Sequence, residues 1–204
     1  MFKIIFGTGN GHKLEELREI TRLYTGHADF IEFVTPEPPF DPIENGSTFE
    51  ENSLIKARAV KPKEGYFILA DDSGLCVEAL DGRPGLYSAR YAPTQDEKIS
   101  KLLTEMENKQ NRRAKFVCAM TLLNEKSEIL FQTRGECHGK IAHVRAGVNG
   151  FGFDPVFIPD ESQNSTPQPA TEPRTLAQMP SDLKNQISHR ANALRTVLEF
   201  MNML

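Results

Sequence analysis

The stretch Leu69-Ala70-Asp71-Asp72-Ser73-Gly74 places two adjacent carboxylates directly after an apolar run that begins at Phe67. Residues 67–70 predict a buried strand, and a second apolar run, Leu75-Cys76-Val77, follows the acidic pair. We therefore expect the strand to end at Ala70 and to present both aspartates at its carboxyl end. Strands like this one, interspersed with helices, predict a mixed α/β fold.

Two adjacent carboxylates repel each other unless a cation lies beside them. Mg²⁺ is typically bound by one or two carboxylates together with substrate phosphate oxygens. One aspartate could bind the metal while the other orients or deprotonates a water molecule. An ordinary surface turn is the alternative, but an acidic pair between two apolar runs favours a site with Mg²⁺ as cofactor.

The segments before this strand alternate between strand and helix patterns. We predict strands at 3–6 and 30–34, with a helix capped by Asn10 between them. A second helix runs from the capping box Thr48-x-x-Glu51 to about Val60.

The segments after it continue the same alternation. Thr94-x-x-Glu97 is a second capping box that opens a helix, and the runs 116–123 and 128–133 flank a turn as a β-hairpin. The chain is helical again from Ser181, in two pieces, with Ser188 able to cap the second. The prediction is one domain over residues 1–204, with a mixed central sheet and helices on both faces.

Composition excludes several classes of protein. The net charge is −4 with scattered basic residues, which argues against a nucleic acid polymer as partner. No run approaches the ~20 apolar residues that cross a membrane. The three cysteines form no C-x-x-C pair, so we expect buried free thiols, no zinc and a cytoplasmic location. Residues 160–174, rich in Pro, Ser, Thr and Gln, predict a mobile surface loop.

The glycine-rich stretch 7–13 follows the first predicted strand and opens a helix. Such a turn directs backbone N–H groups and the positive end of a helix at one point, which suits phosphate. It is not a Walker A loop, because Leu14 follows Lys13, and His12 occupies the third glycine position of a dinucleotide fingerprint. A tight turn that merely needs glycine is the alternative, but Lys13 favours phosphate.

Three further segments carry candidate polar groups. Thr48, Asn52 and Lys56 share one helical face, although a solvated face is the alternative, and Glu44 just before it could bind a metal or lie on the surface. Phe151-Gly152-Phe153-Asp154 offers aromatic rings for stacking and an acceptor, or simply core and turn. Ser188-His189-Arg190, with Lys184 one turn earlier, suits recognition of an anion or a carbonyl group.

Taken together, these segments resemble the inosine and xanthosine triphosphate pyrophosphatases, which remove deaminated purine nucleotides. The matching stretches are TGNGHK (8–13), TFEENSLIKAR (48–58), LADDSGL (69–75), GRPGLYSARYA (82–92), GFGFDPVF (150–157) and KNQISHRANAL (184–194). The resemblance runs nearly end to end and in the order of that family. It implies hydrolysis of ITP, dITP or XTP between the α- and β-phosphates, a homodimer, and an elongated central sheet with a substrate cleft between two lobes.

The resemblance also implies roles for individual residues. Glu44 and Asp72 would bind Mg²⁺, and Asp72 would be the general base. Substrate contacts would come from the triphosphate loop, from Lys56 and Ser73, and from a base pocket. The loop residues are Thr8, Gly9, Asn10, Gly11, His12 and Lys13; the pocket residues are Phe151, Gly152, Phe153, Asp154, Lys184, His189 and Arg190.

Two single-residue departures from the family, a 160–174 loop longer than expected and two alternative functions remain. Gly7 stands where alanine is more usual, and Gln178 where glutamate is common. A phosphohydrolase that releases orthophosphate is one alternative function. A nucleotide-binding regulatory module without turnover is the other.

Overall fold

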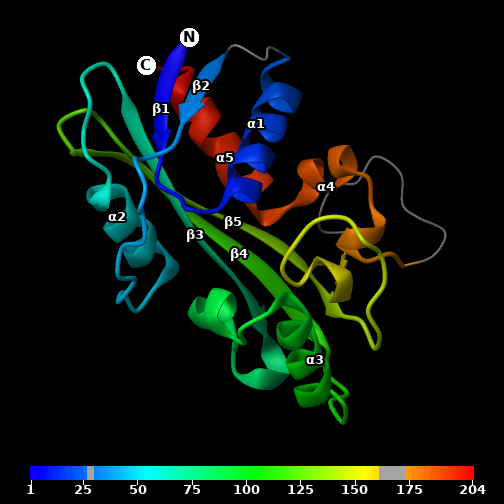
Figure 1. Ribbon diagram of the computed structural model, residues 1–204. Coiled ribbons are helices and arrows are strands. Elements are labelled where there is room, and N and C mark those ends of the chain that lie inside the picture. Colours follow the sequence, from blue (N-terminus) through cyan, green and yellow to red (C-terminus); the bar gives the residue numbers. More distant parts are fainter. Residues whose placement is uncertain (27–29, 161–172) are drawn as a thin grey trace. The chain divides into compact units, whose positions relative to one another are not determined.

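The computed structural model describes residues 1–26, 30–160 and 173–204 (Figure 1). Within these ranges the strands form a six-stranded sheet of order β2-β1-β3-β4-β5-β6. β1 pairs in parallel with β2 and β3, whereas β5 pairs antiparallel with β6, so the predicted mixed sheet is confirmed. The strands are β1 (Phe2–Phe6), β2 (Ile31–Val34), β3 (Phe67–Val77), β4 (Arg113–Leu123), β5 (Ile129–Ile141) and β6 (Phe157–Pro159). Most of the predicted 160–174 loop lies outside the described residues.

Side chains at the helix starts bind the backbone as the sequence predicts. The Asn10 side chain accepts a hydrogen bond from the His12 N–H, and Thr48 and Thr94 cap their helices in the same way. Each bond satisfies an N–H group that has no partner inside its helix. The helices are α1 (Gly11–Thr25), α2 (Phe49–Ala59), α3 (Gln95–Glu105), α4 (Ser181–Ile187) and α5 (His189–Met201).

The chain divides into two compact units. The first contains residues 1–72, 118–135 and 190–204, and the second contains residues 73–117 and 136–189. Three strands, β3, β4 and β5, contribute residues to both units.

Alternating side chains of the strands build two cores in the first unit. In β1, Ile4 and Phe6 belong to a cluster with residues of α1 and α5, whereas Ile5 belongs to a cluster with residues of α2. Because successive strand side chains point to opposite faces, α1 and α5 cover one face of this part of the sheet and α2 covers the other (Figure 1).

The second unit has one apolar core. Ile99 and Leu102 of α3 and Met106 just after it pack there with Leu75 and Val77 from the end of β3 and with Phe153 and Phe157. The apolar stripe predicted for the helix at 95–105 is therefore its buried face.

The end of β3 corrects a prediction. The strand does not end at Ala70 but continues through both aspartates to Val77. Paired charges make this possible, because a carboxylate can lie inside a buried strand when cations and donors surround it. No described helix is long and apolar enough to cross a membrane.

Candidate active site

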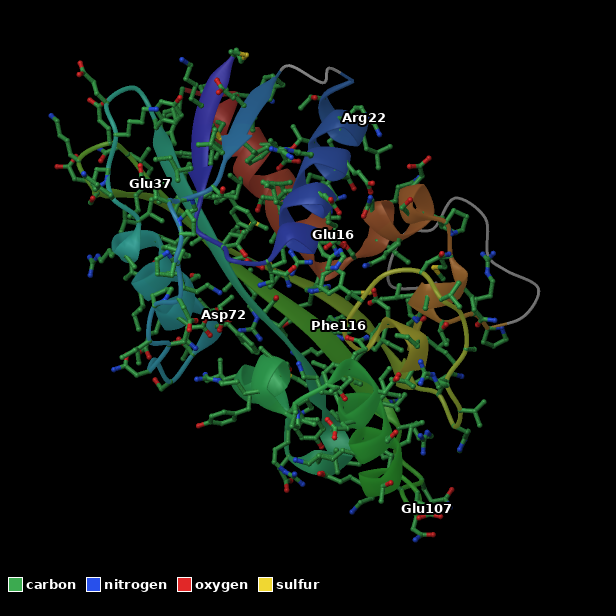
Figure 2. The ribbon with its side chains drawn as sticks, in the orientation of Figure 1. Glu16, Arg22, Glu37, Asp72, Glu107 and Phe116 are labelled. Carbon is green, nitrogen blue, oxygen red and sulfur yellow. The ribbon has the colours of Figure 1, made fainter. Side chains whose placement is uncertain are left out.

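β3 directs its two aspartates to opposite faces of the sheet. Asp71 contacts Lys13 of α1 and Arg190 of α5, whereas Asp72 contacts Asn52 and Lys56 of α2. Figure 2 shows Asp72 on the α2 side. Each carboxylate therefore has its own contacting partners, although the charge of Lys56 acts on both of them.

Asp71 lies at the centre of a buried charge cluster. Both of its carboxylate oxygens accept from Lys13 Nζ at 3.0 Å. Its Oδ2 also accepts from Arg190 Nη2 at 3.1 Å, and Arg190 Nη1 donates to Glu16 of α1. Asp71 is 0% exposed and Arg190 is 1% exposed. Two anions thus balance two cations, of which Arg190 is fully buried and Lys13 is half-buried.

The same cluster sets the ionisation of its members. Burial by itself would raise the pKa of Asp71, but Lys13, Arg190 and Lys56 outweigh it and hold that pKa well below its usual range. Burial lowers the pKa of Lys13, and Asp71 opposes that shift. Asp71 therefore stays an anion and favours the charged form of the half-buried Lys13.

Asp72 belongs to a second cluster on the α2 face. Its Oδ2 accepts from Asn52 Nδ2 at 3.1 Å, and its Oδ1 lies 3.9 Å from Lys56 Nζ. Lys56 Nζ also lies 3.0 Å from Glu44 Oε1. The structure thus brings together three of the residues singled out from the sequence, namely Glu44, Lys56 and Asp72. The shared face of Asn52 and Lys56 on α2 is a lining of this cluster and not merely a solvated surface.

Glu44 and Asp72 have the chemistry of a Mg²⁺ site. Burial raises the pKa of Asp72, Lys56 opposes that shift and Glu44 adds to it, so this carboxylate is short of positive charge. Among the described residues no group of three or more His, Cys, Asp or Glu side chains could hold a metal. A metal bound by only these two carboxylates needs further oxygen ligands from substrate or water, which is the usual mode for Mg²⁺.

The glycine-rich loop connects β1 to α1 through a chain of hydrogen bonds. The Thr8 hydroxyl accepts from the Asn10 N–H at 3.1 Å, and Asn10 Oδ1 accepts from the His12 N–H at 3.0 Å. Thr8 is buried, whereas residues 9–12 are exposed. The first turn of α1 contains no acidic residue, so its positive end has no carboxylate of its own helix to neutralise it.

Asp154 organises the predicted base pocket in the second unit. Its Oδ2 accepts from the Phe151 N–H at 2.9 Å and from Lys184 Nζ at 2.8 Å. Lys184 Nζ also lies 4.9 Å from the centre of the Phe151 ring, a favourable cation–π contact. Three of the predicted pocket residues therefore form one cluster.

Phe153, the second aromatic residue of this turn, has its side chain in the core. Its side chain is 3% exposed, packs in the core and meets the Tyr91 ring edge-on at 6.1 Å. Of the two aromatic rings in this turn, only that of Phe151 is partly exposed. The predicted substrate contact of Phe153 stays a prediction.

The two adjacent residues at the start of α5 have different surroundings. The His189 ring stacks on Phe116 of β4, with 4.8 Å between ring centres and 15° between planes. Arg190 contacts Glu16 and Asp71, as described above. Ser73 lies in β3 and is half-buried. The roles of these residues toward a substrate stay predictions.

The sequence did not single out Glu16, and it did not predict that Asp71 lies buried between Lys13 and Arg190. A signal for Glu16 was present, because it lies three residues after Lys13 and beside Leu17 on the buried face of α1. Nothing local in the sequence shows that Arg190, 174 positions away, is its partner.

The two departures from the resembled family fit this fold. A Cβ at Gly7 would lie 3.0 Å from Val60 Cγ2, so close packing with Val60 favours glycine here. Gln178 Oε1 accepts from the Thr175 N–H at 2.9 Å, the bond that a glutamate would also accept in a capping box.

Comparison with known proteins identifies the family. A sequence profile of the Ham1 family matches residues 4–200. The dITP/XTP pyrophosphatase of Campylobacter jejuni is 42% identical and covers 98% of both chains. The Ham1 protein structures from Staphylococcus aureus and Coxiella burnetii are 34% and 35% identical, with TM-scores of 0.79 and 0.80. The match to the Staphylococcus aureus protein covers 98% of this chain and 98% of that protein, and the match to the Coxiella burnetii protein covers 100% of both chains. The chain belongs to the Ham1 family, and the resemblance found in the sequence is confirmed.

Proposed function

We propose that this Ham1 family member hydrolyses deaminated purine nucleoside triphosphates, namely ITP, dITP and XTP, to the nucleoside monophosphate and pyrophosphate. One observation carries the proposal: Asp72 lies with Glu44 and Lys56 in a chain that matches dITP/XTP pyrophosphatases over almost its whole length. By removing such nucleotides, the enzyme would keep them out of DNA and RNA.

The triphosphate would lie against the loop at residues 8–13. The N-terminal end of α1 and the Lys13 ammonium supply positive charge there. Asp71 holds that ammonium from the opposite side by two bonds of 3.0 Å. A fixed cation of this kind stabilises charge that develops on the leaving pyrophosphate without reorganising during the reaction.

Glu44 and Asp72 would hold Mg²⁺, which neutralises phosphate charge when bound. Lys56, beside both carboxylates, supplies a further cation. Asp72 would orient a water molecule and take its proton as the water oxygen bonds to the α-phosphorus and the bond to the leaving oxygen breaks.

Recognition of the base would come from the second unit. Lys184 and backbone N–H groups are donors, and they match the 6-oxo group of hypoxanthine or xanthine. Adenine would place its amino group against another donor, at a cost of roughly 1–3 kcal/mol per unmatched group. Within the turn at 151–154, the Phe151 N–H already donates to Asp154. Because that N–H group is already used, Lys184 is the stronger candidate to donate a hydrogen bond to the 6-oxo group.

Product analysis with a nucleotide panel tests this function. ITP, dITP, XTP and ATP are incubated with enzyme and Mg²⁺, and phosphate is measured before and after an added inorganic pyrophosphatase. The proposal expects phosphate from ITP, dITP and XTP only after that addition, with ATP much slower. Orthophosphate that appears before the pyrophosphatase is added would favour a phosphohydrolase that removes the terminal phosphate. Nucleotide binding without turnover would favour a regulatory module. Cytoplasmic location and homodimer formation remain predictions from the sequence.

A further inference from the structure

A side chain of α3 binds the turn at residues 151–154 from outside the predicted pocket. Gln95 Nε2 donates to the Gly152 carbonyl oxygen, and the Gly152 N–H donates to Gln95 Oε1 at 3.0 Å. One amide group thus satisfies both backbone groups of a single residue. Two bonds from one planar group fix the peptide planes on both sides of residue 152.

Gln95 is itself held in place because it is the first residue of α3. The Thr94 N–H donates to Glu97 Oε2 at 2.9 Å, and the Glu97 N–H donates to the Thr94 hydroxyl at 3.2 Å. Ile99 and Leu102, four and seven residues after Gln95 on the same side of α3, anchor the helix in the core. The helix start is therefore a rigid support for its first side chain.

The residues on either side of Gly152 are those of the predicted base pocket. Phe151 precedes it, and Asp154, which binds both the Phe151 N–H and Lys184, lies two residues after it. Gly152 has φ of +65°, a conformation that glycine adopts without steric cost. Because glycine is also free to leave that conformation, an external contact is needed to hold it.

We propose, on the basis of the proposed function, that Gln95 is a positioning residue for purine recognition. Its amide fixes the Gly152 backbone and thereby sets the positions of Phe151 and Asp154 against the base. It does not touch the phosphate-binding residues of the first unit. Its loss therefore weakens binding of the base and leaves binding of the triphosphate unchanged.

The test compares Gln95→Ala and Gln95→Glu with Asp96→Ala as matched control. Asp96 is the exposed neighbour of Gln95, and its carboxylate binds Arg145 at 2.7 Å rather than residue 152. For ITP, we expect Gln95→Ala to raise KM about fivefold with kcat within about twofold, as the loss of one or two neutral hydrogen bonds predicts. Gln95→Glu keeps the acceptor but places a carboxylate oxygen against the Gly152 carbonyl oxygen, so its KM should rise at least as much as that of Gln95→Ala. Inhibition by inorganic tripolyphosphate should be unchanged in all three variants.

Several results would overturn the proposal. The first is a KM of Gln95→Ala for ITP within about twofold of wild type. The second is a rise in the KM of Asp96→Ala as large as that of Gln95→Ala. The third is a loss of tripolyphosphate inhibition in Gln95→Ala as large as its rise in KM for ITP. Hydrogen exchange of the Gly152 N–H tests the contact without turnover. It should speed up in Gln95→Ala, and an unchanged rate contradicts the contact. If the wild-type protein does not hydrolyse ITP, the proposed function fails. Hydrogen exchange still tests whether Gln95 holds the Gly152 backbone.

Discussion

At the scale of single residues, the two aspartates of β3 have opposite electrostatic situations. Asp71 is stabilised as an anion by Lys13 and Arg190, whereas burial and the nearby Glu44 disfavour the anion of Asp72. A carboxylate whose surroundings stabilise its charged form adds to the free energy of unfolding. A carboxylate whose surroundings disfavour that form lowers the free energy of unfolding. We therefore expect Asp71 to be chiefly structural, whereas Asp72 stays the proposed metal ligand and general base.

Neutralising each aspartate in turn tests this difference. Asp71→Asn leaves two buried cations short of an anion, and breaking such a pair costs about 3–5 kcal/mol of unfolding free energy. Asp72→Asn should cost less than about 1 kcal/mol or even stabilise the fold, yet it should abolish turnover while nucleotide binding persists. Urea denaturation and kinetics measure both effects. Equal losses of stability in the two variants would contradict the assignment.

The cysteines give a second prediction at this scale. Burial raises the pKa of Cys137 to about 12 and also raises that of Cys118. Since only the thiolate reacts with disulfide reagents, both should stay unreactive in the folded protein at pH 8. Cys76 is half-buried, so we expect no more than one thiol to react before urea is added and three afterwards. Rapid reaction of two thiols in the native protein would count against this.

At the scale of elements, the sequence predicted the features that depend on neighbouring residues, but not those that depend on charge pairs between distant residues. The caps of α1, α2 and α3 lie within four residues of their partners, so the sequence shows them directly. The length of β3 could not be predicted, because it depends on Lys13 and Arg190, which are distant in sequence and adjacent in the fold. The predicted hairpin is confirmed, with both strands longer than expected. The resemblance already paired Glu44 with Asp72 as metal ligands, whereas only the fold shows that Lys56 lies beside both carboxylates.

The capping box of α3 supports a prediction at this scale. Thr94→Ala removes the hydroxyl that binds the Glu97 N–H and should lower the unfolding free energy by about 1 kcal/mol. Because the same turn carries Gln95, KM for ITP should rise as well, though less than in Gln95→Ala. Urea midpoints and steady-state kinetics measure the two effects. A destabilised variant with wild-type KM would show that the start of α3 does not influence the base-binding turn.

At the scale of the whole molecule, the predicted substrate contacts are distributed over both units. The first unit contains the loop at 8–13, Glu44, Lys56, Asp72 and Arg190, and the second contains Ser73, the turn at 151–154, Lys184 and His189. Strands β3, β4 and β5 run through both units. The predicted substrate cleft between two lobes stays a prediction.

Metal removal is a prediction about the complete enzyme. If Glu44 and Asp72 hold Mg²⁺ between protein and phosphate, a chelator such as EDTA should abolish hydrolysis of ITP, and excess Mg²⁺ should restore it. The unfolding free energy of the free protein should change little, because two carboxylates alone bind Mg²⁺ weakly without substrate. Full activity with excess chelator would exclude the proposed metal role.

The identity of the phosphate product tests the central claim most directly. Wild-type enzyme with ITP and Mg²⁺ is sampled at early times by ³¹P NMR, with Asp72→Asn as control. The proposed function predicts IMP and pyrophosphate in equal amounts, no IDP, and no product from the variant. IDP with orthophosphate, or equal turnover by Asp72→Asn, would contradict it.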